Sequence, residues 1–177
     1  MRTRGAVFFF AAAFVIQATL LRGAAFDGVS PNLLLSAAIV FAFLYEKPYG
    51  LALGAAFGLL WDLNFGIYVG VSAISVMCAA LAMMLLKRFL NHELVLPALV
   101  GALMASALNN AVYWGIYKLL GIPHSLFYIL KPQLTLIAYN TLLALALHLV
   151  LRRGVIRHRR DQYYKGGFRE VGGFRFL

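Results

Sequence analysis

Long apolar segments separated by short polar breaks run through most of the chain. Segments this long and this poor in charge predict helices that cross a membrane. Six can be placed, at about Gly5–Leu21, Pro31–Tyr45, Tyr49–Leu63, Val69–Leu86, Leu94–Leu119 and Leu126–Leu151. The pattern therefore predicts an all-α, polytopic membrane bundle with six transmembrane helices.

The second segment is short for a membrane span. Its fifteen residues reach only roughly 22 Å as a helix, whereas the hydrocarbon core is roughly 30 Å thick. Either Ala24–Val29 completes this span, or neighbouring helices shelter a short one. Its start is marked by Ser30, which suits an N-cap, and by Pro31, which suits the first helical turn.

The first segment allows two interpretations. It follows the basic stretch Met1–Arg4 and precedes the small residues Gly23-Ala24-Ala25. It is therefore either a span that stays in the protein or a signal peptide that is removed. The cation Arg22 beside that cleavage site favours the uncleaved span, and the rest of the topology is the same in both cases.

Composition narrows the class of protein. Of the 177 residues, 63% are hydrophobic and only 12% are charged, and the mean hydropathy is +0.83. A single core in water has no place for so much apolar surface, which excludes a soluble enzyme or a free DNA-binding domain. The lone cysteine, Cys78, allows no intrachain disulfide.

The charges predict an orientation. Lys and Arg number 16 against 6 Asp and Glu, and cations collect in cytoplasmic loops of membrane proteins. With both termini inside, only Arg22, Lys118 and Lys131 lie outside. We therefore expect a six-helix transmembrane domain over residues 1–151, both termini in the cytoplasm, and no nucleic-acid partner.

Residues 152–177 form a basic tail with paired glycines, which we expect to be disordered and cytoplasmic. Such a tail contacts either anionic lipid headgroups or a cytoplasmic protein, and the sequence leaves both open. The contacting cations would be Arg152, Arg153, Arg157, Arg159 and Arg160.

Catalytic motifs are missing from the sequence. It has no phosphate-binding Gly-Lys-Ser/Thr loop and no Gly-x-Ser-x-Gly nucleophile elbow. His92, His124 and His148 have no partner at metal-ligand spacing. Asp62 is the only acid inside an apolar segment, so neighbouring positions cannot build a pair of carboxylates. We expect neither an enzyme nor a cofactor or metal site.

Small residues form two stripes at helical spacing. Gly50, Gly54 and Gly58 lie four apart with Asp62 next in line, so all four share one helix face. A second stripe, in the fifth segment, consists of Gly101, Ala105 and Asn109, beside Ala102, Ser106 and Asn110. Such faces let helix backbones approach closely in lipid. They serve either packing within this chain or an interface with a partner helix.

Asp62 suits a structural role at the outer end of its helix. Its carboxylate can accept hydrogen bonds from the backbone of the following turn, which contains Asn64, Gly66 and Gly70. Pairing with Lys118 or Lys131, or a contact with a partner or ligand, are the alternatives.

Other polar side chains within the spans are expected to hydrogen-bond across helices, because a buried amide without a partner is costly. They are Asn109, Asn110, Asn140 and His148. Asn140, Ala144 and His148 share one face of the last helix, and Pro132 either kinks that helix or starts it.

These residues together resemble a known family. The pattern consists of Pro31-Asn32-Leu33-Leu34-Leu35, the ladder Gly50, Gly54 and Gly58-Leu59-Leu60 with Asp62, the turn glycines Gly66 and Gly70, Pro132 and Tyr139-Asn140, and a basic tail. It resembles the bacterial rod shape-determining protein MreD family. Asn32 stands where that family often has Asp after the proline.

The resemblance implies a function. It implies a non-enzymatic scaffold of the cell-elongation machinery, in the multi-pass inner membrane. The implied partner is a bitopic MreC-like protein, with links to MreB, RodA and the elongation-specific penicillin-binding transpeptidase. It also implies a fold similar to the substrate-binding subunits of energy-coupling-factor vitamin transporters.

That similarity in fold suggests an alternative function. The chain would then be a transporter subunit that captures a vitamin-like ligand, in a pocket around Asp62, Asn109 and Lys118. A lipid-modifying enzyme is a third hypothesis, which the shortage of acids, bases and nucleophiles argues against.

Overall fold

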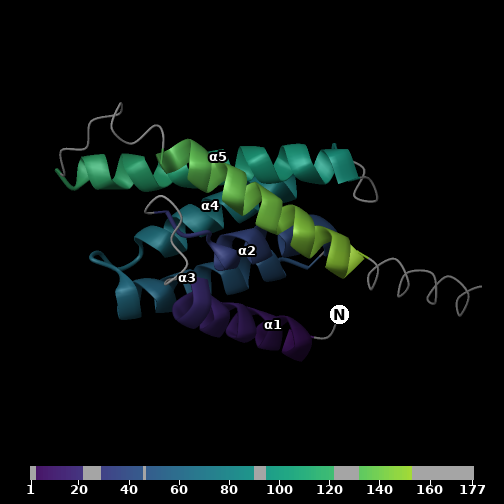
Figure 1. Cartoon of the computed structure of the whole chain (residues 1–177), viewed down its shortest axis with the longest axis horizontal. Coiled ribbons are helices and arrows are strands. Elements are labelled where there is room, and N and C mark those ends of the chain that lie inside the picture. The colour runs from purple at the N-terminus through teal and green to yellow at the C-terminus, as the bar shows by residue number, and fades with distance from the viewer. Residues whose placement is uncertain (1–2, 22–28, 46, 90–94, 122–131, 153–177) are drawn as a thin grey trace, which may run out of the picture.

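The computed structural model describes residues 3–21, 29–45, 47–89, 95–121 and 132–152 (Figure 1). These residues are helical apart from short connections, as the sequence predicts. The helices are α1 (Thr3–Ile16), extended by a π-helical turn η1 (Gln17–Leu21), α2 (Leu33–Leu44), α3 (Tyr49–Phe65), α4 (Val71–Leu86), α5 (Val95–Leu119) and a C-terminal helix (Pro132–Arg152).

Three of these helices are long and apolar enough to cross a membrane: Thr3–Leu21, Val95–Leu119 and Pro132–Arg152. α2 and α4 are apolar but shorter. The sixth predicted segment starts at Leu126, which lies outside the described residues, and the described part of that helix starts at Pro132. The arrangement with six membrane spans therefore stays a prediction.

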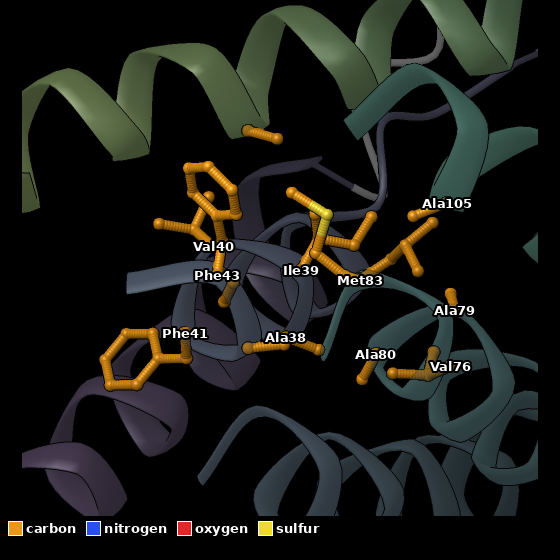
Figure 2. Close-up of a cluster of buried hydrophobic side chains, with 14 of the residues drawn as sticks. Ala38, Ile39, Val40, Phe41, Phe43, Val76, Ala79, Ala80, Met83 and Ala105 are labelled. Carbon is orange, nitrogen blue, oxygen red and sulfur yellow. The ribbon is translucent and has the colours of Figure 1, made fainter. Parts of the chain in front are cut away.

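α2 is the centre of the bundle. All twelve of its residues are buried, because α1, α3, α4 and α5 pack around it. Its side chains, with those of α4 and α5, form the core shown in Figure 2. On α1, the ring of Phe10 contacts Phe41 of α2 and Phe57 of α3, at 5.2 and 5.9 Å between centroids. A helix of about 18 Å is thus sheltered by its neighbours, the second of the two explanations for its length.

The start of α2 differs from the prediction. Ser30 and Pro31 lie outside the helix, and the N-cap is Asn32. The Asn32 side chain accepts a hydrogen bond from the backbone N–H of Leu35 at 2.9 Å. The prediction was wrong because Asn is as good an N-cap as Ser. Asn32 is the residue that reaches a backbone N–H group without a partner in the first turn of the helix.

The glycine ladder of α3 packs inside this chain. A Cβ atom at Gly50 would meet backbone atoms of Ala38 and Ala42 on α2. A Cβ at Gly54 would lie 2.8 Å from the Ala38 Cβ and 3.0 Å from a methyl carbon of Val76 on α4. These glycines therefore let α3 contact α2 more closely than any other residue would allow.

The lower part of the ladder contacts α4. A Cβ at Gly58 would lie 3.0 Å from the Cα of Ala73, and Gly50, Gly54 and Gly58 are all buried. The face of the ladder is thus occupied by α2 and α4. Of the two roles considered for it, packing within the chain is the one this geometry supports, and no free surface is left there for a partner helix.

The second small-residue stripe is also buried. Gly101, Ala105 and Asn109 face into the chain, as do their neighbours Ala102, Ser106 and Asn110. Figure 2 places Ala105 beside Ala79 of α4, in agreement with the packing of α5 on α4. Both stripes therefore contribute to the interior of the same bundle.

Side-chain hydrogen bonds join several helices at one end of the bundle. The hydroxyl groups of Thr3 and Tyr49 lie 3.1 Å apart, and the Lys87 ammonium donates to the carbonyl of Tyr45 at 2.6 Å. This end therefore gathers the start of α1 and α3 with the end of α2 and α4. The C-terminal helix also ends there (Figure 1). The predicted cytoplasmic side corresponds to this end of the bundle, and the orientation itself stays a prediction.

We expect Gly50→Ala to lower the free energy of unfolding by about 1–3 kcal/mol, because the added methyl forces α3 away from the α2 backbone. Gly115→Ala on α5 is the matched control, since nothing lies within 4 Å of a Cβ built there. Its expected effect is zero to about 1 kcal/mol of stabilisation. Thermal unfolding of both purified variants in detergent measures this, and equal melting temperatures would contradict the packing.

Candidate functional site

Polar side chains within the bundle form three separate groups, and none has the composition of a metal centre. Among the residues that the structure describes, no three His, Cys, Asp or Glu side chains come together. The three groups are the turn held by Asp62, the cap at the start of α2, and a cluster on α5. Each group consists of polar residues of a kind that is rare in apolar helices, because burying them is costly.

Asp62 holds the turn between α3 and α4. Its Oδ2 accepts hydrogen bonds from the backbone N–H groups of Gly70 at 2.9 Å and Ser72 at 2.8 Å. Gly70 is the N-cap of α4 and has φ +97°, a left-handed conformation that glycine adopts without strain. The carboxylate, which is only 3% exposed, therefore sits at the positive N-terminal end of the α4 dipole.

The rest of the turn is packed tightly. The N–H of Gly66 donates to the carbonyl of Asp62 at 2.9 Å, and a Cβ at Gly66 would lie 2.8 Å from the Asp62 Cα. The amide of Asn64 donates to the carbonyl of Leu60 at 2.7 Å. Asp62, Gly66 and Gly70 thus contact one another in this turn, whereas Asn64 bonds back to its own helix.

The predicted alternatives for Asp62 find less support. Lys131 lies outside the described residues, and the Lys118 ammonium lies 4.9 Å over the ring of Trp114. Asn109 bonds to its neighbour Asn110. Asp62, Asn109 and Lys118 therefore have different contacts, and these contacts do not favour the vitamin pocket over the structural role.

We expect Asp62→Ala to lower the free energy of unfolding by about 1–3 kcal/mol, because two backbone donors lose their acceptor. Asp62→Asn keeps an acceptor oxygen and loses only the charge at the α4 terminus, so its loss should be smaller, about 0.3–1 kcal/mol. Thermal unfolding in detergent gives both values. A loss in Asp62→Asn as large as in Asp62→Ala would show that the charge, rather than the hydrogen bonds, is what matters.

The second group caps the start of α2 with side chains from three parts of the chain. Besides the bond from Leu35 to Asn32, the N–H of Leu34 donates to Oε1 of Gln17 at 3.0 Å. The N–H of Asn32 itself donates to Oδ1 of Asn140 at 2.7 Å. The N–H groups at a helix start have no partner within the helix, so these acceptors are what allows α2 to begin inside the bundle.

Ser36 completes this cap. Its hydroxyl lies 3.0 Å from the carbonyl oxygens of both Asn32 and Asn140. The cap therefore joins η1, α2 and the C-terminal helix. The sequence predicts an interhelical bond for Asn140, whereas the roles of Gln17 and Ser36 were not predicted. A lone glutamine within an apolar span was the available signal for Gln17.

We expect Asn140→Leu to lower the free energy of unfolding by about 1–3 kcal/mol, because the partly buried N–H of Asn32 loses its acceptor. The neighbouring Thr141→Val is the matched control. Thr141 is equally buried, but its hydroxyl has no hydrogen-bond partner, so its removal should be neutral or stabilising. Melting temperatures of the two variants in one detergent decide this, and a greater loss in Thr141→Val would contradict the cap.

The third group lies on α5 and at the start of the C-terminal helix. The Asn109 amide donates to Oδ1 of Asn110 at 3.3 Å, and the Asn110 amide lies 3.5 Å from the carbonyl of Gln133. Asn110 thus bonds across helices as predicted, whereas Asn109 bonds along its own helix. Asn109 is next to Asn110 in sequence, so its side chain reaches Asn110 without a contact to another helix.

His148 differs from its prediction as well. It is 2% exposed, yet neither of its ring nitrogens has a hydrogen-bond partner. Its ring instead contacts Phe43 of α2, with 5.6 Å between centroids. The C-terminal helix therefore meets α2 here through ring packing rather than through a polar bond.

These observations define a class of protein. An all-helical bundle with three helices able to span a membrane uses its polar groups to end helices and to join them. A comparison with protein families matches residues 4–153 to the family described as rod shape-determining protein MreD. The chain belongs to the MreD family. No match was found among curated proteins or among solved structures.

Proposed function

We propose that this chain is a non-enzymatic scaffold of the cell-elongation machinery in the bacterial inner membrane. It binds a bitopic MreC-like protein and helps to position peptidoglycan synthesis. The observation that carries this proposal is the family match over residues 4–153, which supports a role in rod shape determination. MreB, RodA and the elongation-specific transpeptidase are further proposed partners of the same assembly.

The packing restricts where the partner binds. The glycine ladder and the second stripe are buried inside the chain, so a partner helix must use the outer surface of the bundle. That surface carries large apolar side chains such as Phe8 of α1, Leu85 of α4 and Leu142 of the C-terminal helix. In lipid, association on such a surface depends on close packing rather than on the hydrophobic effect.

The basic tail supplies a second proposed contact. Arg152 ends the C-terminal helix, while Arg153, Arg157, Arg159 and Arg160 lie outside the described residues. If the tail is cytoplasmic, its cations lie next to anionic headgroups, each contributing about 1 kcal/mol close to the surface. This attraction holds the end of the chain at the membrane, where cytoplasmic components of the machinery also gather.

Site-specific photocrosslinking in cells tests the scaffold proposal. A photoreactive phenylalanine analogue replaces Phe8, Leu85 or Leu142 in turn, and the same analogue at Phe41 of α2 is the buried control. We expect the MreC-like protein to be captured from at least one exposed position and not from Phe41. Failure to capture it from any exposed position, together with its absence from purified complexes, would reject the proposal.

A further inference from the structure

A cluster of buried and partly buried polar side chains lies where the C-terminal helix starts. We call it the outer polar cluster: Ser106, Asn109, Asn110 and Trp114 of α5, with Gln133 of the C-terminal helix. Ser106, Asn110 and Trp114 follow one another at i+4 spacing and so share a face of α5. The Asn110 amide lies 3.5 Å from the carbonyl of Gln133, and the C-terminal helix starts near α5 in Figure 1.

Four polar atoms of this cluster have no hydrogen-bond partner although they are buried. They are the Ser106 hydroxyl, Oδ1 of Asn109, the indole N–H of Trp114 and Oε1 of Gln133. Ser106 is fully buried and Asn109 is 6% exposed. An isolated polar group of this kind is destabilising in an apolar environment. Four of them, three on α5 and one on the C-terminal helix beside it, indicate a place where a further hydrogen-bonding group is bound.

The unpartnered atoms define the chemistry of that group. Two are amide oxygens that accept, one is an indole N–H that donates, and one is a hydroxyl that does both. None carries a formal charge. Lys118, the nearest cation along α5, is engaged over the Trp114 ring. The complementary group is therefore neutral and carries hydroxyl or amide groups, which offer donors and an acceptor together.

The cluster reaches from the interior of the bundle toward its surface. Ser106 is fully buried, whereas Trp114 and Gln133 are only partly buried. A molecule beside the bundle could therefore reach Trp114 and Gln133 first, without the helices coming apart.

We propose that the outer polar cluster binds a neutral group bearing hydroxyls or amides, between α5 and the C-terminal helix. Such a group comes either from the head of an uncharged lipid or from a small water-soluble molecule. Asn109 and Gln133 accept its donors, and Trp114 donates to it. This site is independent of the proposed partner interface, which lies on the outer surface.

Trp114 itself is the reporter for the test. The protein has two tryptophans, so Trp61→Phe leaves the emission of Trp114 alone. The purified full-length variant in detergent is titrated with 1-monooleoylglycerol for the lipid source and with glycerol for the soluble source. Methyl oleate, with the same chain and no hydroxyl, is the matched control probe.

We expect a saturable shift of Trp114 emission with monooleoylglycerol or glycerol, and none with methyl oleate. Adding Ser106→Ala or Asn109→Leu should raise the half-saturating concentration at least tenfold. Asn64→Ala, whose side chain bonds within α3, should leave it unchanged. A response to monooleoylglycerol alone assigns the lipid source, and a response to both probes assigns the soluble one.

Two results would overturn the proposal. The first is the absence of a saturable shift with both monooleoylglycerol and glycerol, which would mean that the cluster binds only water. The other is a shift that methyl oleate reproduces or that Ser106→Ala does not weaken. Thermal unfolding shows whether Asn109→Leu is folded. If it is not, Ser106→Ala, which removes a single oxygen atom, tests the site instead. Because the assay contains no partner, it is independent of the photocrosslinking result.

Discussion

A helix that begins inside a bundle has backbone N–H groups with no partner in the helix itself, and α2 is such a helix. Its twelve residues are all buried, and the N–H groups at its start bond to the side chains of Asn32, Gln17 and Asn140. In hydrocarbon an unpaired backbone group is more costly than in water. The start of the central helix therefore depends on its own N-cap and on acceptors from two distant parts of the chain.

Close packing makes this enclosure possible. The glycines of α3 allow its backbone to lie directly on α2 and α4, and α5 covers the other side with small residues. The surface of the bundle then carries large apolar side chains. An apolar surface of this kind agrees with a family of shape-determining membrane proteins.

Spacing along the sequence predicted which residues share a face, but not what covers that face. Gly50, Gly54 and Gly58 were expected together and are together. Whether α2 or a foreign helix lay against them depended on contacts between segments that periodicity does not contain. Asp62 was placed in its turn because its partners are local, whereas Gln17 was missed because Leu34 lies 17 residues away and belongs to another helix. Ser30 failed as an N-cap for a related reason, since two suitable residues lie only two positions apart and the bond to Asn140 holds Asn32 at the helix start.

The bond between Asn32 and Asn140 joins residues 108 positions apart. During synthesis the second helix therefore leaves the ribosome long before the side chain that completes its cap. Until the C-terminal helix packs against α2, the N–H of Asn32 lacks the acceptor that it has in the folded bundle. The cap of the central helix can therefore be completed only after the chain has been synthesised as far as its C-terminal helix.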